Sequence, residues 1–317
     1  ADVSGLANIA IGALSADALT TGICNVAIGV NALGASTTGC LNVAIGELAL
    51  GATIVTGKNN IALGTTAMDA VTSGEINVGL GLNALGALTT GKNNVGLGEN
   101  ALGGSTTGCL NIAIGETALG NSDTTGINNI AFGKNAMDAL TGGLCNIAIG
   151  VNALGTSTTG CMNIAIGTTA MSECTATGIV NTAINQNALR CLTTGKCNVG
   201  IGKDAGAGIT TGCGNVAIGE LALGACAHTG KCNIGIGLEA GKSITSGFLN
   251  TSVGKSAGAG ITAGENNGMF GHAAGNNPDR SGNFDNVIHL GNQSITAFNV
   301  TVALTVLSDA RDKTDVA

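Results

Sequence analysis

Eleven cysteines are the most reactive side chains in this 317-residue sequence, and they could form disulfides or bind a metal. Most of them fall at two adjacent positions of a repeat, so pairs on successive turns would be out of register and point to opposite faces. Cys174 and Cys191 are the exception, because their spacing predicts Cα atoms about 4.8 Å apart, within disulfide range. Alanine fills the same position elsewhere, as at Ala70 and Ala139. This favours thiols that pack as small residues, in keeping with assembly in a reducing cytoplasm.

Carboxylates and histidines could supply a cation site or a hydrolytic centre. Glu99 and Glu116 take equivalent positions in neighbouring repeats and could share a cation, although a solvated pair is the more ordinary arrangement. Asp279 and Asp285 could bind calcium, but their loop lacks a regular ligand spacing. The histidines do not join an Asp and a Ser in a catalytic constellation; they are His228, His272 and His289. We therefore expect no metal, no cofactor and no catalytic site in the repeats.

Asparagine recurs every 17 or 18 residues, at the head of the phrase Asn-(Ile/Val)-(Ala/Gly)-(Ile/Leu)-Gly. A fixed period of this size indicates a solenoid, in which each coil stacks on its neighbours and buries little by itself. A looser seventeenth copy is centred on Asn286. The regular ladder consists of Asn8, Asn25, Asn42, Asn60, Asn77, Asn94, Asn111, Asn129, Asn146, Asn163, Asn181, Asn198, Asn215, Asn233, Asn250 and Asn267.

Two glycines recur at fixed distances from each ladder asparagine, which we number as position 0. Position +4 is glycine in 15 of the first 16 coils, and position −3 is glycine in 16 of 17. The exceptions are Asn185 and Asn283, and asparagine is the residue that best tolerates positive φ after glycine. We therefore predict left-handed turns at both corners. Representative corner residues are Gly29, Gly46 and Gly115 at +4, and Gly39 and Gly108 at −3.

The residues after the asparagine alternate in size, as in Ile112, Ala113 and Ile114. A period of two predicts a short strand with large side chains on one face and Ala or Gly on the other. Alanine recurs at +7, usually followed by Leu or Met, which predicts a second short segment. Each coil is thus expected to run strand, turn, strand, turn, around a thin core of one Ile or Val pair and one Leu or Met.

Four coils near the C-terminus carry glycine at +8 instead of Leu or Met, and three of them gain an isoleucine six residues before the next asparagine. This exchange predicts that core volume is moved and not lost. The glycines are Gly206, Gly241, Gly258 and Gly275, and the isoleucines are Ile209, Ile244 and Ile261.

A stack of 16 to 17 coils at a strand spacing of about 4.8 Å would be a rod of roughly 80 Å. Each coil buries about three large aliphatic side chains, at about 1.5 to 3 kcal/mol each, against some 17 residues to be ordered. This is too little for a free single chain. We expect other copies to pack against the Ala-rich faces, which makes a homo-oligomer.

Composition narrows the range of partners. The formal charge is −7 with only 12 Lys and Arg spread along the chain, which argues against nucleic acid. Aromatic residues make up 2 %, without Trp or Tyr, so the surface is poor in residues that usually dominate binding. The apolar runs are too short for a membrane span, and no signal-like segment opens the sequence.

The Asn-Val-Ala-Ile-Gly phrase with its small-residue segment resembles the head repeats of trimeric autotransporter adhesins of the YadA-like type. The resemblance covers about 85 % of the chain, and it departs in period, because those head coils are typically shorter. It implies a left-handed parallel β-roll in a three-chain bundle. Handedness and three-fold symmetry come from this resemblance alone.

The last ten residues, from Ser308 through Asp309, Arg311 and Lys313 to Ala317, look like the opening of the intramolecular chaperone domain that follows phage tail fibres, tailspikes and endosialidases. That resemblance implies trimerisation and a single self-cleavage, with Ser308 as nucleophile and Lys313 as general base. A capped surface turn is the alternative. The expected organisation is a β-solenoid shaft over 1–271, a transition region over 272–307 and the start of the chaperone over 308–317.

The first functional hypothesis is a structural one: a homotrimeric shaft of a phage tail fibre in the virion, joined to other tail proteins and supporting attachment to a host receptor. The second is the head of a trimeric adhesin on a bacterial surface. A third is an ice- or ligand-binding solenoid, suggested by stacked threonines but disfavoured because Thr-Thr-Gly lies in a turn. A fourth, an acyltransferase β-helix, lacks the consistent 18-residue period and the catalytic histidine.

Overall fold

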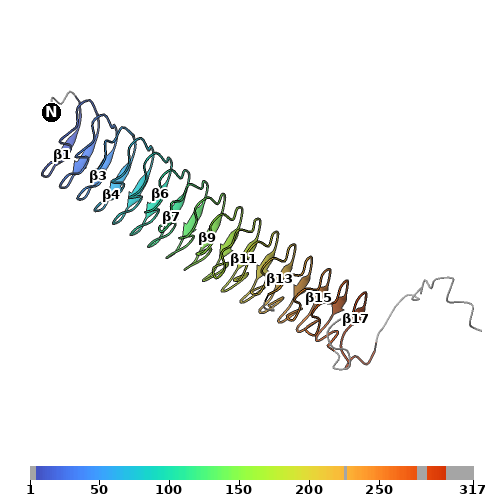
Figure 1. Cartoon of the computed structure of the whole chain (residues 1–317). Coiled ribbons are helices and arrows are strands. Elements are labelled where there is room, and N and C mark those ends of the chain that lie inside the picture. The colour runs from blue at the N-terminus through green and yellow to red at the C-terminus, as the bar shows by residue number, and fades with distance from the viewer. Residues whose placement is uncertain (1–4, 225–226, 277–283, 298–317) are drawn as a thin grey trace, which may run out of the picture.

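The computed structural model describes residues 5–224, 227–276 and 284–297, and it shows a long, straight stack of coils with one strand in each (Figure 1). The described residues contain no helix. The strands are β1 (Ile9–Ile11), β2 (Val26–Ile28), β3 (Val43–Ile45), β4 (Ile61–Leu63), β5 (Val78–Leu80), β6 (Val95–Leu97), β7 (Ile112–Ile114), β8 (Ile130–Phe132), β9 (Ile147–Ile149), β10 (Ile164–Ile166), β11 (Thr182–Ile184), β12 (Val199–Ile201), β13 (Val216–Ile218), β14 (Ile234–Ile236), β15 (Thr251–Val253), β16 (Gly268–Phe270) and β17 (Ile288–Leu290).

The 17 strands form one parallel sheet in which each strand pairs with the strand of the coil before and the coil after. Pairing joins equivalent residues, so that Ile112 lies beside Ile130 and Ala113 beside Ala131. The predicted all-β parallel solenoid is confirmed. The second strand predicted near +7 is wrong, because this segment is a turn whose residues at +6 and +8 have left-handed backbone, as at Thr117 (φ 52°) and Leu119 (φ 50°).

The two faces of the sheet are the reverse of the expected arrangement. The small residue at +2 points into the coil and is fully buried, whereas the large residues at +1 and +3 point outward and are partly exposed. We call the +2 residues the inner row and the +1 and +3 residues the outer rows. The prediction of an Ile or Val pair in the core, and of other chains packing on Ala-rich faces, is therefore wrong. The coil is too narrow for branched side chains at +2, and only Ala, Gly or Ser occupies that position in β2 to β15.

The core is completed by side chains from the turns. Alanine at +7 and Leu or Met at +8 are fully buried in most coils, as are Ala118 and Leu119. The exchange near the C-terminus is confirmed: a Cβ added to Gly206 would lie 2.9 Å from Cδ1 of Ile209, and one on Gly241 would lie 3.1 Å from Cδ1 of Ile244. The isoleucine thus fills the space that Leu or Met fills in other coils.

The ladder asparagines form a continuous buried hydrogen-bond chain inside the stack. In the coil of Asn111, Oδ1 accepts from the backbone N (2.9 Å) and Nδ2 (3.2 Å) of Asn129, while Nδ2 donates to the carbonyl of Gly126 (2.8 Å). The bond from the backbone N to the Oδ1 of the preceding asparagine recurs from Asn8 to Asn267, and the bond between the side-chain amides accompanies it in most coils. Each amide therefore satisfies backbone groups that the narrow coil would otherwise bury without partners.

The +4 corner has positive φ, as predicted. Gly29, Gly46 and Gly115 have φ of 136°, 133° and 134°, well beyond the left-handed α region that other residues can adopt. A Cβ on Gly115 would also lie 2.7 Å from the carbonyl of Gly133 in the next coil. Asn185 takes this position with a φ of 97°. Conformation and close stacking both select glycine here.

The −3 corner does not have positive φ, so the prediction is wrong for Gly39 and Gly108. Glycine is needed there for space alone. A Cβ on Gly108 would lie 2.6 Å from the carbonyl oxygen of Thr124 in the next coil, and one on Gly22 would lie 2.3 Å from that of Gly39. Asn283, the departure from glycine at this position, lies outside the described residues.

The seventeenth coil differs from the predicted repeat. Strand pairing aligns Ile288 with Gly268, so Val287 and not Asn286 occupies the ladder position. The backbone N of Val287 donates to Oδ1 of Asn267 (3.0 Å), and the chain of side-chain amides ends there. Asn286 instead matches Asn266, whose Nδ2 donates to its Oδ1 (2.8 Å).

Four coils contain 18 residues, and the additional residue is accommodated in the turn before the −3 glycine. In these coils the inward-facing residue moves from −6 to −5, and its carbonyl is bonded by a serine hydroxyl of the preceding coil in three cases. Ser105 Oγ, for example, donates to the carbonyl of Thr124 (2.7 Å). The residues at this inserted position are Val55, Thr124, Ala176 and His228, all buried.

Candidate interaction surface

The outer rows place two lines of apolar side chains along the whole sheet. Exposed fractions are 38 % for Ile112 and Ile130 in the middle of the stack and 52 % for Phe132, against 0 % for Ala113 between the outer rows. Because the strands are in register, the side chains repeat at the strand spacing of about 4.8 Å. Scattered exposed apolar residues are ordinary, but a continuous apolar surface of this length marks an interaction site.

Residues beside the outer rows extend the apolar surface on both sides. Before the strand, positions −2 and −1 present exposed Ile23, Leu41 and Leu144; after it, position +5 presents Val30 and Val151. Ion pairs between coils interrupt these flanks, such as Glu75 with Lys92 (3.0 Å) and Glu116 with Lys134 (2.8 Å). Exposed ion pairs of this kind add little stability, about 0 to 1 kcal/mol each. The surface is therefore an apolar strip along the outer rows, with charged side chains at its border.

The +1 line is interrupted where threonine or glycine replaces a branched residue. Thr251 and Gly268 leave a hollow of about 260 Å³ between β15 and β17, lined also by Leu249, Phe270 and Ile288. The Phe270 ring leans over Gly268, where a Cβ would lie 2.9 Å from Cε2 of the ring. The outer surface is thus less regular at the C-terminal end.

A second hollow, of about 370 Å³, lies before strands β14 and β15. It is lined by hydroxyls of Thr229 and Ser246, the Lys231 side chain, Phe248 and Leu249. Phe248 is 42 % exposed. This is the place where an aromatic ring, a cation and hydroxyls meet on the coil surface.

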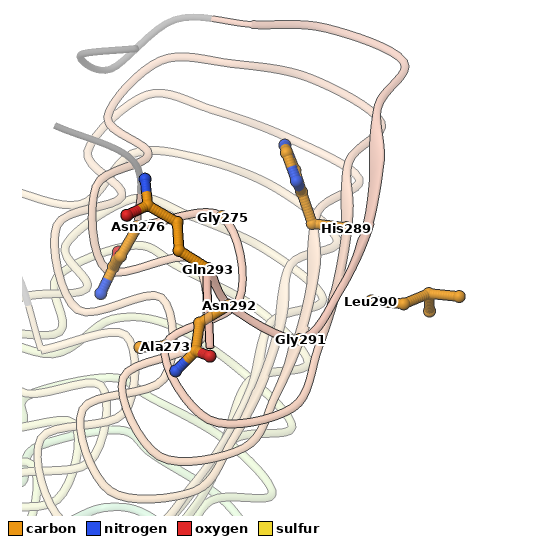
Figure 2. A pocket seen from close by; sticks show the side chains of 8 residues that line it. All are labelled: Ala273, Gly275, Asn276, His289, Leu290, Gly291, Asn292 and Gln293. Atoms are coloured by element: carbon orange, nitrogen blue, oxygen red, sulfur yellow. The ribbon is translucent and has the colours of Figure 1, made fainter. Parts of the chain in front are cut away.

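The C-terminal end of the stack contains a third hollow, of about 240 Å³, around His289 (Figure 2). His289 stands in the inner row, beside Met269, where alanine stands in most strands. Its ring contacts Phe284 edge-on with centroids 5.7 Å apart, and amide side chains of Asn276 and Gln293 face the same space.

The described members of the two acidic pairs bond other groups in the structure. Glu116 forms an ion pair with Lys134. Oδ1 of Asp285 accepts a hydrogen bond from the backbone N of Glu265 (2.8 Å). Within the ranges that the structure describes, no group of three or more His, Cys, Asp and Glu side chains is close enough to hold a metal ion. Asp279 lies outside those ranges.

His228 is a buried histidine whose backbone is hydrogen-bonded, its N donating to the carbonyl of Gly208 (2.8 Å), but whose ring is not. It is fully buried at the inserted position of its coil, and neither ring nitrogen is satisfied. Burial lowers its pKa to about 4, and the nearby Gly230 backbone opposes this only in part. It is enclosed in the core, where it packs at the inserted position of its coil. His272 and His289 lie near the C-terminal end of the stack.

Ser308 and Lys313, the predicted self-cleavage pair, lie outside the described residues. The outer rows are the candidate site that the sequence pattern misplaced. The signal was present as a small residue between two large ones, but a period of two does not state which face is buried. The outer rows present a long apolar strip, which is suited to packing against another apolar surface.

No protein-family model matches this sequence, and no curated protein matches it. In the described part of the chain, no helix has the length and apolar character needed to cross a membrane. The class that the fold defines is a parallel β-solenoid repeat protein.

Proposed function

We propose that the chain is the shaft of a homotrimeric viral tail fibre, in which three copies pack along the outer rows and hold host-attachment parts away from the virion. The observation that carries this proposal is the +3 line of apolar side chains, which runs outward from β1 to β17, partly exposed and repeated in register beside the +1 line. A surface with the same period is the one that matches it over the whole length, and another copy of the chain supplies that surface.

Energetic reasoning supports self-association. The core of a single coil contains mainly alanine with one or two larger apolar side chains, whereas the large apolar side chains at +1 and +3 are left outside. Packing these side chains between copies would stabilise the assembly by about 0.8 kcal/mol for each CH₂ group removed from water. The same gain would recur in every coil. The corrected placement moves the interface from the inner row to the outer rows and leaves the expected oligomer unchanged.

The tail supports the viral setting by resemblance. Ser308 and Lys313 match the nucleophile and general base implied for the start of an intramolecular chaperone, and a trimer would be assembled by that domain before one self-cleavage. Sequencing the gene beyond residue 317 and comparing the mass of the expressed product with that of Ser308→Ala tests this part. A product that keeps the same mass in both would contradict self-cleavage.

The decisive test of the shaft is the mass of the chain in solution, measured by sedimentation or light scattering. We expect a trimer whose assembly is lost in Ile130→Glu with Phe132→Glu, because four added charges per pair of neighbouring chains cannot be buried unpaired. Thr107→Glu, exposed beside a turn, is the matched control and should remain trimeric. A stable monomer of the natural sequence would overturn the proposal.

A trimeric adhesin head on a bacterial surface is the alternative that shares the same interface. An export signal and a membrane anchor encoded in the full gene would favour it, whereas detection of the chain in purified virions would favour the fibre. An ice-binding face is less well supported, because the exposed threonine row at −4 is one residue wide and borders charged side chains such as Lys58 and Lys92.

A further inference from the structure

Charged side chains border the apolar strip on both sides. We call the residues at −2, before each strand, the leading flank, and the residues at +5, after each strand, the trailing flank. Ion pairs join charges of the same flank on neighbouring coils. They are Glu75 with Lys92 (3.0 Å) on the leading flank, and Glu116 with Lys134 (2.8 Å) and Lys203 with Glu220 (4.0 Å) on the trailing flank.

Other flank charges form no ion pair among the residues that the structure describes. Glu47 and Lys255 on the trailing flank and Lys58 on the leading flank are exposed, and Glu265 on the leading flank is half-buried. Lysines of this group lie near carboxylates of their own flank without a direct contact, as Lys58 does near Glu75. One described chain thus leaves these four charges without a direct partner of opposite sign.

The geometry of a symmetric bundle decides which flank residues meet. Copies whose outer rows face a common axis along the stack all run in the same direction, and the trailing flank of one copy meets the leading flank of the next. Each coil of 17 or 18 residues advances the chain by one strand spacing of about 4.8 Å. A residue at +5 therefore lies between the levels of −2 in its own coil and −2 in the following coil. On the neighbouring copy, its side chain can reach either of those two residues.

This geometry brings the unpaired charges together with opposite signs. Glu47 of one copy would lie beside Lys58 of the next, and Lys255 would lie beside Glu265. In both cases a residue at +5 meets the residue at −2 of the following coil. The two contacts are far apart along the stack and follow the same rule.

The charges that are already paired within the chain fit the same arrangement. Glu116 would lie between Cys109 and Ile127 of the neighbouring copy, and Lys134 between Ile127 and Leu144. These leading-flank residues have no opposite charge to offer. Glu116 and Lys134 instead pair with each other in their own chain.

Lys203 is the trailing-flank residue that approaches a like charge, because it would lie between Lys196 and Cys213 of the next copy. Its Nζ lies 4.0 Å from Oε1 of Glu220, which belongs to the following coil of the same chain. This ion pair directs Lys203 toward the level of Cys213 and away from Lys196. Glu220 itself would lie beside Lys231 of the next copy.

We propose that the copies pack in parallel and in register, with the trailing flank of each bound to the leading flank of the next through the ion pairs Glu47–Lys58 and Lys255–Glu265. The inference rests on the proposed packing along the outer rows and specifies how the copies are aligned. Apolar side chains repeat in every coil, so they match nearly as well after a shift of one coil. A shift that moves Lys255 back by one coil would place it beside Lys231. Charge order thus supplies the alignment that the apolar strip lacks.

Carbodiimide cross-linking of the natural chain tests the contact directly, because this reagent joins a lysine amine to a carboxylate that touches it. Trypsin does not cut after a modified lysine, so a link from Lys255 of one copy to Glu265 of another gives fragment 243–280 joined to fragment 256–280. Residues 256–280 then occur twice in one product, which only two copies can supply. We expect this product, and its absence from a chain that sediments as a trimer would overturn the alignment.

Charge reversal measures how much the pair contributes. Lys255→Glu and Glu265→Lys each place like charges in contact, and we expect each to raise the concentration at which half of the trimer dissociates by about tenfold. The double variant restores opposite signs and should dissociate near the concentration of the natural chain. Asp17→Lys makes the same change of charge as Glu265→Lys at an exposed turn away from both flanks, and it should have no effect.

The shaft and the alignment can fail separately in this experiment. A natural chain that is monomeric would overturn the shaft. A natural chain that is trimeric, with a double variant that dissociates as readily as the single variants, would overturn the ion-pair alignment and leave the trimer in place.

Discussion

Ile112 and Ala113 are neighbours in one strand, yet the larger side chain is 38 % exposed and the smaller is fully buried. In an ordinary half-buried sheet the larger residue would point to the core. Here the coil is so narrow that its interior holds alanine, one or two larger side chains from the turns and the asparagine ladder. The comparison teaches that in this protein the inside is selected for fit and hydrogen bonding, while the outside holds the apolar area.

The largest expected effect comes from breaking the asparagine ladder. Asn111→Leu would leave the backbone N of Asn129 and the carbonyl of Gly126 without partners, at about 1 to 3 kcal/mol each, or about 4 kcal/mol together. It would also remove one of the two hydrogen bonds that Nδ2 of Asn129 donates. Hydrogen exchange should show local opening of the coils around β7 and β8. Asn121→Ala, an exposed asparagine bonded to Asp138, should have little effect. Equal protection in both variants would contradict the role of the ladder.

Overfilling the inner row should come next. Ala113→Leu places a side chain where Ala131 and the turn side chains leave no space, and we expect a loss of about 3 kcal/mol in the free energy of unfolding. Denaturant unfolding followed by circular dichroism measures this loss. A Leu variant as stable as the natural chain would mean that the interior is less tightly packed than the coil geometry indicates.

His228 is an inward polar side chain without the hydrogen bonds that the ladder asparagines make, and we expect it to make the stability depend on pH. In the unfolded chain His228 binds a proton with a pKa near 6.5, but in the folded chain only at about 4, so the unfolded state takes up more protons between these values. Stability should therefore fall as the pH decreases from about 6.5 to 4, with about 2 kcal/mol lost between pH 7.5 and 5.

Val55 occupies the equivalent inserted position, so His228→Val is a matched control. The variant should lose this component of the pH dependence, measured as the difference between its denaturant midpoints and those of the natural chain across the pH range. An unchanged pH profile would show that protonation of His228 does not contribute to it.

The smallest effect is expected for an outer side chain within a single chain. Ile112→Ala removes a partly exposed group that leaves no internal cavity, so the separated chain should lose below about 1 kcal/mol. Measured at concentrations where the chain is monomeric, this value compares directly with Ala113→Leu. A larger loss for Ile112→Ala than for Ala113→Leu would invert the proposed difference between the rows.

Several features were predictable from residues alone because they depend on local conformation or on period. The recurrence of asparagine indicated the stack, and the single departure at Asn185 indicated positive φ at +4, which the structure has at 97°. The compensation between Gly206 and Ile209 was also visible in the sequence. Gly206 replaces the Leu or Met of other coils, and the side-chain volume lost there is regained by Ile209.

Other features depended on atoms of the next coil. Gly39 and Gly108 looked like conformational glycines, but the carbonyl of the following coil is what excludes a Cβ, and no pattern within one repeat contains that atom. Asn286 was assigned to the ladder by spacing, whereas strand pairing gives that position to Val287.

By itself, the sequence determined that this protein is a β-solenoid of stacked, asparagine-headed coils with glycine at two corners. Tertiary structure alone decided which face of each strand is inside. The alternation of Ile, Ala and Ile has the same period in either orientation, so only the width of the closed coil could choose. It admits alanine and leaves the isoleucines outside, where the proposed interface lies.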